Sequence, residues 1–190
     1  MTKARDLANG GFGLVLVKPS SVVGGTDNGK GTVSFSAATP SLNNVFSSTY
    51  ENYSILINLT NNSANDGDIY FRLRANGSDT TTTYYWARRG WTMVSGAGTD
   101  GNGNNVSGFT VMTQDSVTTG YSHIQLNVFS PFLGQKTKVS WVGSATTDAA
   151  NVYSQFGGGV LDNTLSYDGF SLVNQNGTST GNISVYGYNK

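Results

Sequence analysis

The sequence is poor in charged residues, has no cysteine, and contains only three prolines and one histidine. Of its 190 residues, 11 are basic and 11 acidic, so the formal net charge is zero and charged residues make up 12% of the chain. That fraction is about half the usual value for a soluble protein. Without a surplus of lysine and arginine, a nucleic-acid-binding protein is not expected. The lack of cysteine excludes disulfides and cysteine-ligated zinc, and the scarcity of charged helix formers argues against a helical bundle.

Long apolar runs are also missing. The nearest approach, residues 14–17, is the length of one short strand, far below the roughly 18 residues of a membrane helix. Residues 1–6 lack the apolar stretch of a signal peptide. We therefore expect a protein that is made in the cytoplasm and does not insert into a membrane.

Small polar residues and aromatics fill the chain instead. Serine (22), threonine (22), asparagine (20) and glycine (25) account for nearly half of it, and aromatic residues reach 12%. Threonine and aromatic residues favour strands. An aromatic-rich chain without net charge is not typical of disorder, and 190 residues suit one domain with a single core.

Alternation of apolar and polar residues predicts β-strands from residue 32 onward. The residues expected to face inward on four of these strands are Val33 and Phe35; Tyr53, Ile55, Ile57 and Leu59; Ile69, Phe71 and Leu73; and Ile124, Leu126 and Val128. The complete pattern gives about nine or ten strands, and no segment between them has the length of a helical crossover. The predicted fold is all-β, an antiparallel β-sandwich of jelly-roll type.

The first 30 residues differ from the rest. Residues 2–8 have helix-forming character, residues 9–11 (Asn-Gly-Gly) end that character, and an apolar strand follows over residues 12–17. We predict an N-terminal arm or attachment segment over residues 1–30 and a sandwich domain over residues 31–190. The alternative is an ordinary edge element folded back onto the core.

Glycine and asparagine mark the expected turns. The pair Asn76-Gly77 suits a two-residue hairpin, and Gly90 is a candidate β-bulge. Residues 95–105 are expected to be a loop. Within it, residues 100–104 (Asp-Gly-Asn-Gly-Asn) match only the first half of a calcium-binding loop, so a solvated loop is favoured and no metal site is predicted.

Catalytic sets are not expected. His123 is the only histidine, its strand pattern places it on the outer face, and no Gly-x-Ser-x-Gly elbow is present. Glycosidases need two facing acids, but Asp66, Asp68 and Asp79 lie in or beside predicted turns. We expect neither an enzyme nor a bound cofactor.

One cluster combines arginine with aromatic residues and is the candidate contact site for a ligand or another subunit. Its members are Arg72, Arg74, Tyr84, Tyr85, Trp86, Arg88, Arg89 and Trp91. Arginine beside aromatic rings can bind a sugar, a carboxylate or a protein surface. The simplest alternative is a solvated strand face whose arginines pair with Asp66, Asp68 or Asp79.

Several short segments resemble the structural proteins of tailed bacteriophages, in the group of tail fibres, head fibres and appendages. They are residues 3–8 (Lys-Ala-Arg-Asp-Leu-Ala), residues 45–53 (Val-Phe-Ser-Ser-Thr-Tyr-Glu-Asn-Tyr), residues 71–74 (Phe-Arg-Leu-Arg) and residues 183–188 (Ile-Ser-Val-Tyr-Gly-Tyr). Each segment is short, but together they span nearly the whole chain. The chain is shorter than a usual tail fibre and has no shaft repeat, which leaves room for a head fibre or a capsid-decorating protein.

The resemblance implies a virion structural protein with a β-rich body, commonly a homotrimer, that contacts other virion proteins of the capsid or tail. It implies that an N-terminal segment, here Lys3, Arg5, Asp6 and Leu7, attaches the protein to the particle, while outward loops can touch a host-surface glycan. Two alternatives are a decoration (cement) protein that stabilises the capsid shell and, from another class, a lectin-like carbohydrate-binding module.

Overall fold

The computed structural model describes residues 13–61, 67–98, 100–114, 121–146 and 152–188. These residues form two antiparallel sheets packed against each other, which confirms the all-β sandwich; the jelly-roll connectivity stays a prediction. The strands are β1 (Leu14–Val17), β2 (Ser21–Val23), β3 (Gly25–Asp27), β4 (Thr32–Ala37), β5 (Ser41–Asn43), β6 (Asn52–Asn61), β7 (Gly67–Ala75), β8 (Ser78–Asp79), β9 (Tyr84–Thr92), β10 (Gly101–Val106), β11 (Phe109–Gln114), β12 (Tyr121–Phe129), β13 (Thr137–Thr146), β14 (Val152–Leu161), β15 (Gly169–Asn174) and β16 (Ser179–Tyr188).

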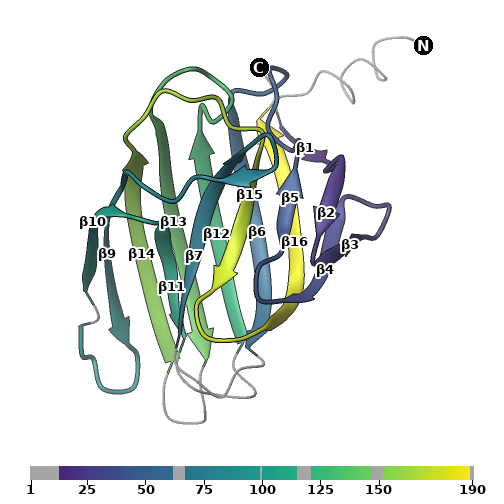
Figure 1. Ribbon diagram of the computed structural model, residues 1–190. Helices are drawn as coiled ribbons and strands as arrows, with labels where there is room; N and C mark the ends of the chain where they lie inside the picture. Colours follow the sequence, from purple (N-terminus) through teal and green to yellow (C-terminus); the bar gives the residue numbers. More distant parts are fainter. Residues whose placement is uncertain (1–12, 62–66, 99, 115–120, 147–151, 189–190) are drawn as a thin grey trace.

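The two sheets differ in width. The larger has the order β10-β9-β14-β13-β12-β6-β16-β4-β3, with β1 pairing beside β4 on β16, and the smaller has the order β11-β7-β15-β5-β2, with β8 on β7. Figure 1 shows β9 and β10 at one end of the molecule and β1 to β4 at the other. The larger sheet therefore extends beyond the smaller one, and β9 and β10 reach past its edge strand β11.

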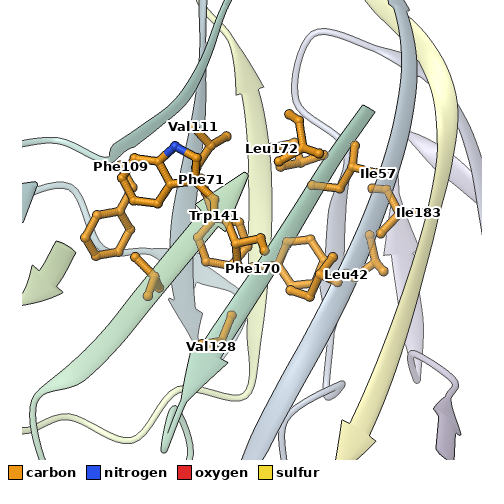
Figure 2. Close-up of a cluster of buried hydrophobic side chains, with 14 of the residues drawn as sticks. Leu42, Ile57, Phe71, Phe109, Val111, Val128, Trp141, Phe170, Leu172 and Ile183 are labelled. Carbon is orange, nitrogen blue, oxygen red and sulfur yellow. The ribbon is translucent and has the colours of Figure 1, made fainter. Parts of the chain in front are cut away.

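Strict alternation of burial builds the core between the sheets. The inward residues of β6, β7 and β12 are almost completely buried, as their spacing predicts. Phe71 and Phe170 of the smaller sheet have ring centroids 5.1 Å apart, and Figure 2 shows them among Trp141, Ile57 and Ile183 of the larger sheet. The sandwich is thus held by large aromatic and aliphatic side chains that interdigitate from both layers.

The predicted Asn-Gly hairpin is confirmed. Ala75 pairs with Ser78, and Asn76 and Gly77 have φ angles of 52° and 77°. Two successive positive φ angles define the turn whose twist matches antiparallel strands, and asparagine and glycine are the residues that tolerate it.

The first 30 residues need a correction where they are described. β1 pairs with β16, β2 with β5 and β3 with β4, so these residues lie at the edges of the sheets and do not leave the domain. The domain accordingly begins no later than Leu14. These strands have only three or four residues and are largely exposed, so their sequences show no clear alternation. The predicted helix over residues 2–8 lies outside the described residues.

Three further expectations are wrong. Gly90 pairs with Gln155 in an unbroken register, and the irregularity lies instead in β10, between Gly103 and Val106. Residues 101–106, expected to belong to a loop, form β10. The described residues also contain more strands than the predicted nine or ten, because β2, β3, β5, β8 and β10 are too short or too glycine-rich to show alternation.

Candidate functional site

Six of the eight residues of the arginine–aromatic cluster lie on β9 and divide between its two faces, whereas Arg72 and Arg74 lie on β7. Burial alternates along this strand, with Tyr84, Trp86 and Arg88 on the inner face and Tyr85, Arg89 and Trp91 on the outer face. Successive side chains of a strand point to opposite sides of the sheet, so residues that are adjacent in sequence cannot form one site. The structure therefore separates the β9 members of the predicted cluster into two surfaces.

Tyr84 has a structural position. Its ring is fully buried and packs edge-to-face on Phe109, with centroids 4.7 Å apart. Its hydroxyl accepts a hydrogen bond from the Leu73 amide (2.9 Å) and donates one to the Thr80 carbonyl (3.0 Å). Burial raises the pKa of Tyr84 far above the ordinary tyrosine value, so the hydroxyl stays protonated and joins β7 to β9.

Arg74 is also held within the fold. Its guanidinium pairs with Asp79 at 2.5 Å and donates to the hydroxyls of Ser41 (3.2 Å) and Ser171 (2.8 Å) and to the Asn43 side chain (3.0 Å). These partners lie on β5, β8 and β15, so Arg74 joins three strands on the outer side of the smaller sheet. With its donors engaged by the protein, Arg74 is not available to a ligand.

A cleft of about 500 Å³ lies where β9 and β10 extend past the edge of the smaller sheet. Its lining residues come from β7, β9, β10, β11 and the connection between the last two: Asp68, Tyr70, Trp86, Arg88, Gly101, Asn102, Val106, Ser107, Gly108 and Thr110. Its volume falls within the usual range for small-molecule sites. Of the predicted cluster, Trp86 and Arg88 line this cleft.

Arg88 is the central charged group of the cleft. Its side chain is only 12% exposed, its guanidinium carbon lies 5.5 Å from the centroid of the Trp86 ring, and its NH1 lies 3.7 Å from Asp68 Oδ1. Burial lowers the pKa of Arg88, and the nearby Asp68 carboxylate opposes that shift. The distance to Asp68 is too long for a hydrogen bond, so the ion pair compensates this buried cation only partly.

Arg72 supports one wall of the cleft. Its Nε donates to the Ser107 carbonyl (2.8 Å), its NH2 donates to the Ser107 hydroxyl (3.2 Å), and its guanidinium lies 5.9 Å from the centroid of the Tyr70 ring. These contacts fix the connection between β10 and β11. Arg72 therefore positions Ser107 at the rim.

The outer face of the larger sheet forms the second surface. Arg89 pairs with Asp100 at 3.6 Å and lies over Trp91, whose ring centroid is 5.9 Å from that of Phe156 on β14. The neighbouring strands β14, β13, β12, β6 and β16 carry only one lysine, Lys138, and no arginine, aspartate or glutamate. Most of this face is therefore uncharged.

Exposed apolar side chains lie on this uncharged face. Leu56 (40% exposed), Val142 (51%) and Phe156 (48%) belong to one row that crosses β6, β12, β13 and β14, with Gln125 in the same row. A shallow groove of about 430 Å³ follows the row between Leu56 and Val142. Neither the row nor the groove was predicted, because they depend on strand pairing and not on sequence neighbours.

His123 lies on this outer face, as its strand pattern predicts. It is exposed, and its Nδ1 lies 2.6 Å from Asn58 Oδ1 on the neighbouring strand. Across the sheet, His123 lies in one row with Asn58 on β6, Ser144 on β13 and Ser154 on β14.

Asp100 to Asn104 run into and along the extended strand β10 and do not form a rounded loop. Alternate residues of a strand lie about 6.8 Å apart, which is too far for three side chains to converge on one calcium ion. Within the described ranges, no three histidine, cysteine or acidic residues gather where they could hold a metal.

Sequence reasoning missed part of the cleft lining, namely Tyr70, Asn102 and Ser107. It did name Asp68 as a candidate arginine partner, and the Arg88–Asp68 and Arg74–Asp79 pairs confirm that pairing; Asp66 lies outside the described residues. The alternating pattern of their strand did place Asp68 and Tyr70 on its polar side. That pattern predicts that the two side chains are exposed, but it does not show which other strand lies next to them.

No protein-family model matches the chain, and no curated protein matches it. Among the described residues, no helix is long and apolar enough to cross a membrane.

Proposed function

We propose that this chain is a non-enzymatic structural protein on the surface of a bacteriophage particle, a short fibre or appendage that assembles as a homotrimer and contacts the host surface. The observation that carries the proposal is the uncharged outer face of the larger sheet. Solvated sheet faces normally carry charged residues, whereas the cores of protein interfaces are depleted of them. The resemblance of several short sequence segments to those of phage fibres and appendages adds to this support.

The size of the face suits a stable contact. Five strands at about 4.8 Å spacing and ten residues at about 3.4 Å per residue cover about 800 Å². About 800 Å² per partner is the standard size of a specific protein interface. In a closed trimer each subunit uses two different patches, so this face would contact another patch of the next copy.

A lysine in the apolar row tests the assembly. Val142→Lys should shift the purified chain toward the monomer in sedimentation velocity, because the lysine charge would be desolvated in the contact. The matched control is Val23→Lys, since Val23 is similarly exposed (56%, against 51% for Val142) but lies on β2 of the smaller sheet. Equal oligomeric states for the wild type and Val142→Lys would contradict the proposed contact.

A truncation tests the attachment. Residues 14–27 pair with the sheets, so the deletion should remove residues 1–12 only, which contain Lys3, Arg5, Asp6 and Leu7. We expect a folded chain that no longer joins particles. Normal incorporation of this variant would refute the role of the segment.

A decoration protein is the competing function on the same particle. Particles that lack the protein should lose resistance to heat or osmotic shock if it cements the shell. Unchanged particle stability together with reduced host adsorption supports the fibre or appendage role.

A further inference from the structure

We propose that the cleft between β7, β9 and β10 binds a saccharide that carries a carboxylate group, with Arg88 contacting the carboxylate. This inference deepens the proposed host-surface contact, and its biological meaning rests on that proposal. The binding itself is a property of the isolated chain.

The first argument is the unmet hydrogen-bonding capacity of the cleft. Arg88 Nε and NH1 and Trp86 Nε1 are buried, and none has a hydrogen-bond partner among the described residues. The nearest carboxylate oxygen, Asp68 Oδ1, already accepts a hydrogen bond from the Thr113 hydroxyl at 2.8 Å. Buried donors without partners are costly and rare, so a bound group that supplies acceptor oxygens would stabilise this arrangement.

The second argument is that glycine keeps these groups close together. A Cβ atom at Gly101 would stand 3.0 Å from Arg88 Nε, and one at Gly103 would collide with the indole nitrogen of Trp86. Both glycines lie on β10, the neighbouring strand of the same sheet, where Gly101 pairs with Arg88 and Gly103 pairs with Trp86. The absence of side chains here allows Arg88 and Trp86 to stack against the β10 backbone beside an open cleft.

The third argument is the mixture of chemical groups. Tyr70 and Trp86 offer ring surface for the C–H face of a sugar, while Asp68 and Ser107 offer acceptors and donors for hydroxyl groups. Arginine is the residue best suited to hold a carboxylate through paired hydrogen bonds. A neutral sugar would use the rings and the polar side chains but would leave the Arg88 charge uncompensated.

The position of the cleft is compatible with assembly. Trp86 and Arg88 lie on the inner face of β9, on the opposite side of the sheet from Val142 and Phe156. A subunit contact on the outer face would therefore leave the cleft accessible.

The test is calorimetric titration of the purified full chain with digalacturonic acid and with N-acetylneuraminic acid, using galactobiose as the neutral probe. We expect binding of at least one acidic probe and markedly weaker binding of the neutral one. Arg88→Gln should weaken the acidic probe at least about tenfold, the usual effect of losing a charged hydrogen bond. Arg89→Gln is the matched control, because Arg89 also pairs with an aspartate and a tryptophan but lies on the opposite face, and it should bind like the wild type.

A second variant keeps the inference testable if Arg88→Gln does not fold, as judged by circular dichroism. Ser107→Asp adds a negative charge at the rim of the cleft and should weaken the acidic probe about three- to tenfold while changing the affinity of the neutral probe much less. Equal affinity for acidic and neutral probes, or an equal loss with Arg89→Gln, overturns the inference. If the protein is incorporated into particles but binds none of the probes, only the inference about the cleft is overturned. If it binds an acidic probe but is not incorporated into particles, only the proposed attachment to the particle is overturned.

Discussion

The three consecutive glycines of β14 give a sharp test of how the core is packed. Gly157 and Gly159 face inward, whereas Gly158 faces outward. A Cβ atom at Gly157 would stand 2.6 Å from Trp141 Cε2, closer still to Trp141 Cζ2, and 2.7 Å from the Ala87 carbonyl oxygen. At Gly158 the nearest atom would be the Val139 carbonyl oxygen, 3.3 Å away.

The expected cost of Gly157→Ala follows from these distances. Carbon atoms pack best at about 3.5–4.0 Å, so the Trp141 ring would have to retreat by about 1 Å. Trp141 is 3% exposed, and the Ala87 carbonyl belongs to the paired strand β9, so neither group can move freely. Overpacking of this kind costs about 1–3 kcal/mol, and the second collision places the variant at about 3 kcal/mol. The gain from replacing glycine by alanine, about 0.5–1 kcal/mol, leaves a net loss of about 2 kcal/mol.

Equilibrium unfolding in urea measures this loss, and Gly158→Ala is the control. We expect Gly158→Ala to change the free energy of unfolding by less than about 0.5 kcal/mol, since its mild contact offsets the alanine gain. The double variant Gly157→Ala with Trp141→Phe should be less destabilised than the sum of the single variants, because the smaller ring makes room. Equal stabilities of Gly157→Ala and Gly158→Ala would refute the packing argument.

Other predictions concern buried polar groups. Tyr84→Phe should lower the free energy of unfolding by about 2 kcal/mol or more, because the Leu73 amide and the Thr80 carbonyl lose their partner. Urea unfolding checks this, and a loss below about 0.5 kcal/mol, half the net contribution of a typical hydrogen bond, would contradict it. The pKa of Tyr84 is raised in the folded protein, so its hydroxyl contributes fully to stability below the pKa of tyrosine in the unfolded chain, about 10, and this contribution is lost as the pH rises above that value. Between about pH 9 and 12 the thermal unfolding temperature should therefore decline less steeply for Tyr84→Phe than for the wild type. Asp79→Ala should cost about 3 kcal/mol because it leaves a mostly buried guanidinium unpaired, whereas Asp100→Ala, in an exposed pair, should cost less than about 1 kcal/mol in the same assay.

The long strands could be predicted because they are half-buried. In β6 and β12 every second residue faces the core, so the hydrophobic effect imprints a period of two on the sequence. The Asn76-Gly77 turn was equally predictable, since its backbone conformation restricts the residue types. Both features depend only on residues that are close to one another in the sequence.

The glycines show what the sequence could not reveal. Glycine was expected to gather between strands, yet Gly143, Gly157 and Gly159 lie within strands, beneath Met112, Trp141 and Phe109. A glycine that provides room for a ring from another strand has the same sequence signature as a glycine in a turn. Only the pairing of the strands shows which role applies.

The cleft was unpredictable for the same reason. Asp68 and Arg88 are 20 positions apart in the numbering, on strands of different sheets, and they meet because β9 extends past the edge strand β11. The alternation of β9 did imply that Arg88 and Arg89 point to opposite faces. Treating them as one cluster overlooked the period of two that had identified the strands.

The few charged residues of the chain are unevenly distributed over this fold. The four ion pairs among the described residues lie on the smaller sheet, at β9 and β10, or in connections, while the middle of the larger sheet is left almost neutral. A neutral face can lose its water against another protein at little electrostatic cost, whereas a partly compensated guanidinium favours an anionic ligand. Because the two features use opposite sides of the larger sheet, Val142 and Arg88 variants should alter assembly and ligand binding independently.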